Sequence, residues 1–173
     1  PTPTYTSSIT SAEQARYNSA QSRRLSISSN GIYINNSGSS NQISIDQVGR
    51  NEQVAGIGQQ SMPVNGTGNQ ITIAQGDTIS YQGQILLEAN IYGSYNVVSV
   101  NQGRSLTGVS SGADMGGHYA SVSISGDSNA ISISQVGSLH YAETTITGSN
   151  NTHTLSQTGS SQQYFGVVNG NSN

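Results

Sequence analysis

The feature of this sequence that most restricts its fold is a short pattern that occurs five times. The pattern is Gly, two residues of any type, Asn, and then Gln at the sixth position after the Asn. In four of the copies, aliphatic side chains stand at the second and fourth positions after the Asn, and polar or small ones stand between them. Alternation of β-branched and polar residues is typical of a strand with one buried face. The recurrence therefore predicts a repeat of short strands.

The pattern predicts a role for each residue that it fixes. Glycine adopts the positive φ of tight turns, and turns are expected at Gly38, Gly66, Gly93, Gly126, Gly148 and Gly170. Amides at equal positions of stacked repeats can bond to one another, and ladders are expected along Asn41, Asn69, Asn96, Asn129 and Asn151 and along Gln47, Gln75, Gln102, Gln135 and Gln157. The expected core residues are Ile43, Ile45, Ile71, Ile73, Val98, Val100, Ile131, Ile133 and Leu155. His153 takes an apolar position of the last copy and is expected as a packed side chain.

Each copy of the pattern is preceded by a second alternating stretch, such as Ala120, Val122 and Ile124 before Gly126. The unit therefore consists of a strand, a Gly-x-x-Asn turn, a second strand and a Gln-x-Gly turn. The five Asn residues are 28, 27, 33 and 22 residues apart, so the shortest spacing predicts a bare coil and the others predict insertions, such as Gly103 to Gly117. One coil cannot bury its own apolar face. The expected fold is an all-β solenoid of about five to six repeats with irregular insertions over residues 25–173.

Residues 1–24 lie outside the repeats. Ser11 to Gln14 matches a capping box, and the Ala, Gln and Arg residues that follow favour a helix near residues 11–23. Two interpretations of this N-terminal segment are compatible with its composition. It is either a capping helix or frayed tail over the first repeat, or an arm that reaches a neighbouring subunit. Leu25 and Ile27 are expected to begin the first alternating stretch.

The composition excludes several classes of partner. Five Lys and Arg residues provide no basic surface for nucleic acid, and no apolar run approaches 18 residues, so no membrane span is expected. The absence of cysteine excludes disulfides and thiolate metal sites. The first residues, PTPTYTSS, lack the regions of a signal peptide, so either the chain is not exported by that route or the sequence is a mature form that has lost its leader. A start on Pro fits the second alternative, although removal of an initiator Met would leave the same first residue.

No cofactor, metal site or catalytic residue is expected. His118 and His140 are 22 residues apart and both precede Tyr-Ala, so they should stack; such a pair could bind a metal, but it lacks carboxylate or thiol company. We interpret both as turn residues. The eight acidic residues are scattered, and there is no nucleophile elbow or phosphate loop. Tyrosines beside glycine, including Tyr81, Tyr92 and Tyr95, either contact sugars or neighbouring filaments or pack as ordinary strand residues.

The segment Gln135-Val-Gly-Ser-Leu-His140-Tyr-Ala142, with Asn129 six positions before Gln135, resembles the curlin repeat of curli fibre subunits. The pattern of that family is Ser-x5-Gln-x-Gly-x-x-Asn-x-Ala-x3-Gln. Here Asn129 replaces the leading Ser, His140 replaces the turn Asn and Ile146 replaces the closing Gln. The resemblance implies a β-solenoid that polymerises into an extracellular, amyloid-like fibre of a biofilm matrix.

These observations predict a structural subunit, not an enzyme, that joins other copies of itself end to end in an extracellular, cell-surface or biofilm fibre. Contacts with neighbouring filaments or surface glycans are compatible with the exposed tyrosines. The alternative is an adhesive or spacer module of a virion or surface appendage fibre. A soluble carbohydrate-active enzyme is the third hypothesis.

Overall fold

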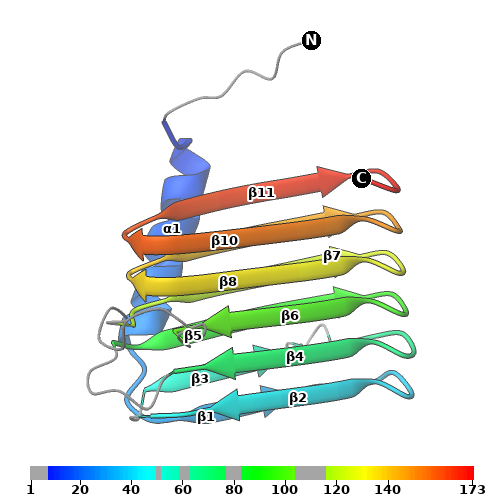
Figure 1. The fold of residues 1–173 in the computed structure, drawn as a ribbon, viewed down its shortest axis with the longest axis horizontal. Coiled ribbons are helices and arrows are strands. Elements are labelled where there is room, and N and C mark those ends of the chain that lie inside the picture. The colour runs from blue at the N-terminus through cyan, green and yellow to red at the C-terminus, as the bar shows by residue number, and fades with distance from the viewer. Residues whose placement is uncertain (1–7, 50–51, 59–62, 77–82, 104–115) are drawn as a thin grey trace.

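The computed structural model describes residues 8–49, 52–58, 63–76, 83–103 and 116–173, and these form one helix and eleven strands (Figure 1). Most of the insertion predicted between Gly103 and Gly117 lies outside these residues. Helix α1 spans Ser11–Leu25. The strands are β1 (Gly31–Ile34), β2 (Gln42–Gln47), β3 (Gln53–Ile57), β4 (Gln70–Gln75), β5 (Ile85–Tyr92), β6 (Val97–Gln102), β7 (Tyr119–Ser125), β8 (Ala130–Ser138), β9 (Tyr141–Thr147), β10 (Thr152–Ser160) and β11 (Gln163–Asn169).

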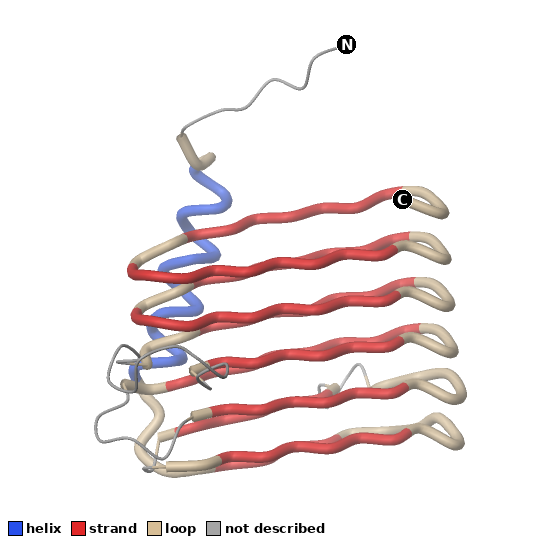
Figure 2. The backbone as a smooth tube through the Cα atoms, in the orientation of Figure 1, coloured by secondary structure: helices blue, strands red, loops and turns tan. Residues whose placement is uncertain are grey.

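Successive strands alternate between two sheets. One sheet has the order β1-β3-β5-β7-β9-β11, and the other has the order β10-β8-β6-β4-β2. Every pairing between neighbouring strands is parallel. The chain therefore winds in a coil, passing once through each sheet before it rises to the next level (Figures 1 and 2). The prediction of an all-β fold is confirmed, with parallel sheets and one short helix.

The register places equal positions of the sequence pattern directly above one another. Ile131 pairs with Val98 on one side and with His153 on the other, although the three residues are separated by different lengths of chain. The longer spacings therefore add residues between strands without changing how the strands pair. This common register aligns the polar side chains into rows along the coil axis.

The core lies between the two sheets and consists of their inward-facing side chains. The pattern residues Ile71, Ile73, Val98, Val100, Ile131 and Ile133 are at most 2% exposed. Ile43, Ile45 and Leu155 are only half-buried, and they pack against the rest of the core. The difference arises because β2 and β10 are the two outer strands of their sheet.

The Gly-x-x-Asn turns stack at one side of the coil (Figure 2). Gly126 has a φ of 146°, and a Cβ atom on it would collide with the carbonyl oxygen of Gly148 in the next turn. Gly66, Gly93 and Gly148 have the same relation to the next turn glycine along the chain. The turns can therefore stack at the spacing of the strands only because these residues have no side chain.

The capping box of helix α1 lies one residue earlier than the sequence analysis predicts. The Thr10 hydroxyl accepts a hydrogen bond from the backbone N–H of Glu13, and the Glu13 carboxylate accepts one from the backbone N–H of Thr10. The predicted box of Ser11 and Gln14 is therefore wrong by one residue. Glu13 is favoured over Gln14 as the second residue of the box because its carboxylate interacts with the positive end of the helix dipole.

The C-terminal end of α1 also differs from the prediction. Leu25 is the last residue of the helix and not the start of a strand, and the first strand begins at Gly31. Arg23 and Arg24 favour the helix in its last turn, where cations interact with the negative end of the dipole. The helix lies along the coil axis on the outer face of the six-stranded sheet (Figure 1). Its side chains contact residues of β5, β7, β9 and β11.

Candidate functional site

The asparagines of the pattern form a hydrogen-bonded row along the coil axis. The Asn129 Nδ2 donates to Asn96 Oδ1 at 3.1 Å and to the carbonyl oxygen of Gly148 at 2.9 Å. Its Oδ1 accepts from the backbone N–H and from the Nδ2 of Asn151, at 2.9 and 3.1 Å. Since an amide side chain has two donor hydrogens and an oxygen that accepts two bonds, Asn129 is fully satisfied although it is 1% exposed.

The same bonds connect Asn41, Asn69, Asn96, Asn129, Asn151 and Asn173. At the N-terminal end of the row, Asn36 Oδ1 accepts from Asn41 Nδ2 at 2.9 Å. Asn36 stands outside the Gly-x-x-Asn pattern, so the sequence analysis did not identify it. At the other end, Asn173 donates to Asn151 through both its backbone N–H and its Nδ2.

The glutamines form a second row, inside the coil. Gln102 Nε2 donates to Gln135 Oε1 at 3.1 Å and to the carbonyl oxygen of Leu86 at 3.2 Å. Equivalent bonds connect Gln47, Gln75, Gln102, Gln135 and Gln157 to one another and to the six-stranded sheet. Each Gln therefore joins the two sheets as well as two coils. Each bond between two Gln side chains is donated toward the C-terminal coil, whereas each bond between two Asn side chains is donated toward the N-terminal coil.

The first strand, β1, has core residues that no described residue covers. Ile32 pairs with Ala55, and the same row continues through Leu87, Ala120 and Ala142. Ala55 and these three residues are 0% exposed, whereas Ile32 is 48% exposed. Ile34 is 51% exposed, although its row partner Ile57 is fully buried. The N-terminal end of the coil therefore presents an apolar edge.

The C-terminal end consists of β10 and β11. Leu155 and Val168 pack against the core but are only half-buried, and the His153 ring lies against the Tyr164 ring with centroids 5.5 Å apart. The strands β1, β2, β10 and β11 together contain one charged residue, Asp46, and no proline. Natural sheets commonly use charge or proline to block exposed edges, and the four described strands at the two ends carry little of either.

An aromatic row on the outer face of the six-stranded sheet holds α1 in place. The Tyr141 ring stacks on Tyr119 and contacts Phe165, with centroids 4.9 and 5.0 Å apart, and the Tyr17 ring of α1 meets Tyr141 edge-on at 5.1 Å. The sequence analysis missed this row. The 22-residue spacing of Tyr119 and Tyr141, each directly after a His, was the available signal.

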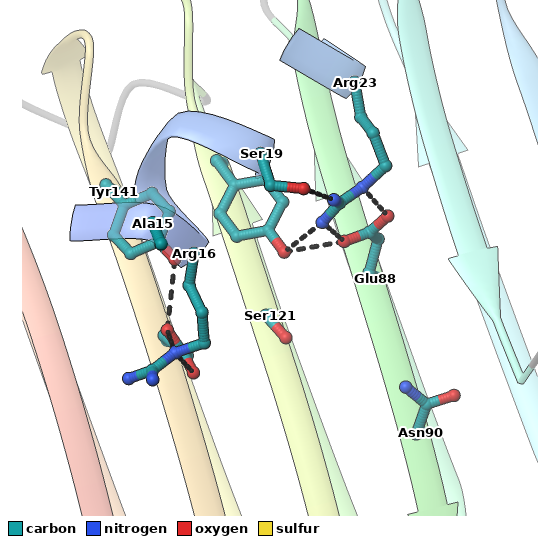
Figure 3. A pocket seen from close by; sticks show the side chains of 10 residues that line it. Ala15, Arg16, Ser19, Arg23, Glu88, Asn90, Ser121 and Tyr141 are labelled. Carbon is teal, nitrogen blue, oxygen red and sulfur yellow. Dashed lines mark hydrogen bonds and ion pairs between the residues drawn. The ribbon is translucent and has the colours of Figure 1, made fainter. Parts of the chain in front are cut away.

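Two ion pairs flank the aromatic row (Figure 3). Arg23 donates to both oxygens of Glu88, at 2.9 and 2.8 Å, and Arg16 Nε lies 2.8 Å from Glu143 Oε1. The hydrogen bond to Glu88 raises the pKa of Arg23. Burial, together with the charge of Glu88, raises the pKa of Tyr119, whose hydroxyl donates to Glu88 at 2.6 Å. These groups form a structural contact between helix and sheet.

The predicted pair of His118 and His140 is stacked, with ring centroids 5.3 Å apart and an interplanar angle of 9°. Both side chains are 0% exposed, and one ring nitrogen of His140 bonds to the carbonyl oxygen of Val136 at 3.0 Å. Among the described residues, no group of three His, Cys, Asp or Glu side chains is placed to hold a metal ion. No helix in the described part of the chain has the length and apolar character needed to cross a membrane.

Two of the tyrosines noted in the sequence, Tyr92 and Tyr95, are exposed at the outer surface. Tyr81 lies outside the described residues. Glu88 and Glu143, which line one cavity on the outer face of the six-stranded sheet, are each bound to an arginine. The polar side chains that continue along the described coil from end to end are those of the two amide rows.

The described fold is that of a repetitive all-β protein with two parallel sheets, in which rows of Asn and Gln side chains connect successive coils. Comparison with protein families places a curlin associated repeat at residues 126–159. The matched segment contains the shortest coil, with β8, β9 and most of β10. The match confirms the resemblance to curlin repeats in this part of the chain. No curated protein and no solved structure matches the sequence.

Proposed function

We propose that this chain is a structural subunit that assembles end to end into an extracellular filament and has no catalytic role. In this proposal, residues 25–173 are a β-solenoid of about five to six strand-turn-strand repeats, and residues 1–24 are an N-terminal arm. The observation that carries the proposal is the exposed apolar edge of β1, where Ile32 and Ile34 continue rows that are fully buried in β3, β5, β7 and β9. The curlin associated repeat at residues 126–159 supports it, because the resemblance described above is to the curlin repeat of curli fibre subunits.

The two ends of the coil differ, so copies join head to tail. All strand pairs are parallel, and β1 at one end presents a different edge from β11 at the other. A head-to-tail contact that does not close into a ring produces an open filament. Pairing β1 of one copy with β11 of the next continues the six-stranded sheet and buries Ile32 and Ile34.

The asparagine row can continue across this junction. Each Asn Oδ1 accepts from the next Asn along the chain, so Asn173 Oδ1 would accept from Asn41 of the following copy. Asn36 holds the Asn41 amide in each separate subunit and would have to release it on joining. Because the six-stranded sheet has one strand more than its partner sheet, this junction also has room for one further strand beside β10.

The proposed location is a cell surface or biofilm matrix, and the proposed partner is another copy of the chain. A second candidate is an adhesive or spacer module of a virion or surface appendage fibre, and the exposed Tyr92 and Tyr95 side chains favour it. Exposed aromatic rings can contact sugar rings of a glycan or a neighbouring filament.

Negative-stain electron microscopy of the purified chain, followed by fibre diffraction, tests the proposal. We expect unbranched filaments with a reflection at about 4.7–4.8 Å along the filament axis, which is the spacing of strands stacked along that axis. A chain that stays monomeric at high concentration would contradict end-to-end assembly. In that case, binding of the monomer to immobilised glycans, with loss of binding in Tyr92→Ala, would support the adhesive module.

A further inference from the structure

The N-terminal tip of α1 extends beyond the last strand of its own chain. Along the helix, Arg23 contacts Glu88 on β5, Tyr17 contacts Tyr141 on β9, and the Arg16 guanidinium lies over the Phe165 ring on β11 at 5.9 Å. The helix therefore ascends the sheet toward its C-terminal end, and its first turn projects past β11 (Figure 1).

The length of this projection can be compared with the spacing of the strands. Ile9 precedes Tyr17 by eight residues, which is roughly 12 Å at about 1.5 Å per helical residue. Strands in a sheet are about 4.8 Å apart, so β1 and β3 of a copy that joins at β11 would lie about 10 and 14 Å beyond β9. The tip therefore reaches the level between these two strands.

The tip carries an exposed apolar side chain. Ile9 is 38% exposed and stands directly before the N-cap residue Thr10. An apolar residue at this position often packs against the fourth residue of the helix, but that residue is Gln14 here. Ile9 therefore lacks the usual apolar partner within its own helix.

A hollow lies on the outer face of the sheet at the matching level. It has a volume of about 190 Å³ and is lined by residues of β1, β3 and β5, including Gly56 of β3, which lies between Tyr33 and Glu88 in the outward-facing row. Tyr33 is 65% exposed. Ile27 packs into the neighbouring cluster with Val54 and Leu86, and it does not line the hollow.

The fold itself gives no reason for glycine at position 56. A Cβ atom there would have its nearest neighbour, the carbonyl oxygen of Leu87, at 3.7 Å, which is an ordinary contact. Its φ also lies outside the positive range that favours glycine. Glycine within a strand weakens it and often marks a place where another group approaches closely.

We propose that the helix tip of one copy inserts Ile9 into the Gly56 hollow of the next copy, so that α1 spans the junction between subunits. The inference rests on the proposed end-to-end assembly and names the surface that aligns the two copies. The occupant is a second copy of this chain because the six-stranded sheet continued through β11 and β1 brings tip and hollow to the same level. Pairing of β1 with β11 and insertion of Ile9 thus involve the same two subunits.

Cysteine cross-linking tests the proposal directly, because the chain contains no natural cysteine. Filaments of the Ile9→Cys/Gly56→Cys variant, treated with a short bis-maleimide, should give a ladder of covalent oligomers on a denaturing gel. The control pair is Ile9→Cys/Ser44→Cys. Ser44 is exposed on β2 of the other sheet, so it lies at the same end of the coil but on the opposite face. We expect at least tenfold more linked oligomer with the first pair than with the control.

The outcomes separate the inference from the proposed function. Filaments that form normally but cross-link equally with both pairs, or with neither, would overturn the inference and leave end-to-end assembly standing. Absence of filaments from the unmodified chain would overturn both. If Gly56→Cys fails to fold, Tyr33→Cys replaces it, since Tyr33 is exposed beside the same hollow.

Discussion

Single residues in this chain are fixed by the close stacking of equal positions. Gly126 combines a φ of 146° with a neighbouring carbonyl oxygen that leaves no room for a Cβ atom. Gly56 has neither constraint. The stacking of the turns therefore requires glycine at position 126, whereas nothing in the coil requires glycine at position 56.

Replacing Gly126 with Ala should lower the free energy of unfolding by at least about 2 kcal/mol, because the substitution adds both backbone strain and a collision between turns. Gly56→Ala should change it by less than about 1 kcal/mol. Urea unfolding at concentrations where the chain is monomeric measures both. Equal effects of the two substitutions would contradict the stacking of turns by glycine.

His153 is predicted to make the stability of the monomer depend on pH. Partial burial lowers the pKa of His153 below its usual value. As the pH falls, the unfolded chain therefore takes up the proton before the folded chain does, so stability is full above about pH 6.5 and decreases below it.

The His153→Leu variant removes this group while keeping an apolar residue in the row of Ile131. Its free energy of unfolding should fall less between pH 8 and pH 5 than that of the unmodified chain. His118 and His140 are present in both proteins, so their contributions cancel in the comparison. The same pH dependence in both proteins would show that His153 does not titrate differently on folding.

At the scale of elements, α1 is attached to the sheet by aromatic packing more than by charge. The side chains of the Arg23–Glu88 pair are 47% and 25% exposed, and pairs of this kind contribute about 0.2–1 kcal/mol. Tyr17 contacts Tyr141 at the centre of the aromatic row. Truncation of Tyr17 would therefore remove both buried apolar area and the edge-on contact between the two rings.

Tyr17→Ala should therefore loosen the helix by roughly 2 kcal/mol, and Arg16→Ala by less than about 1 kcal/mol. Hydrogen exchange of the α1 amides measures this, and a loss of 2 kcal/mol corresponds to about 30-fold faster exchange through local opening. Strand amides of β6 and β8 serve as the internal control and should keep their protection. A larger effect from Arg16→Ala would show that charge holds the helix.

The strands were predictable because their information is local and repeated. Alternation between Asn129 and Gln135 predicts the strand itself, and the same spacing in other copies predicts which residues stack. The helix was predictable for the same reason, although two overlapping matches to a capping box placed the predicted N-cap at Ser11 and not at Thr10. Local patterns predict an element well but place its ends less well.

The contacts between elements could not be predicted in this way. The outward row of Tyr119, Tyr141 and Phe165 depends on which face of the sheet α1 covers, and no local pattern determines that. Asn36 ends the asparagine row from a position without a counterpart in the other copies. The role of such residues can be recognised only from the three-dimensional stacking of the coils.

At the scale of the whole molecule, the interior of the coil is satisfied and its ends are not. In the interior of the described coil, the Asn and Gln side chains of the two amide rows are hydrogen-bonded and the apolar rows are buried. The ends present the same rows with one neighbour missing. This difference supports the proposed association along the coil axis.

The last prediction places a charge at the end of the coil. Ile34→Lys puts an ammonium group into a row that becomes buried when β1 pairs with β11, and burying an unpaired charge is costly. The side chain is 51% exposed in the single subunit, so monomer stability should change little. Val97→Lys is the matched control, because Val97 is 46% exposed but lies on β6, in the middle of the other sheet. The critical concentration for filament formation, measured by sedimentation, should rise more than tenfold for Ile34→Lys and less than twofold for Val97→Lys. Equal rises would indicate lateral association of filaments, and no rise for either would exclude β1 as the joining edge.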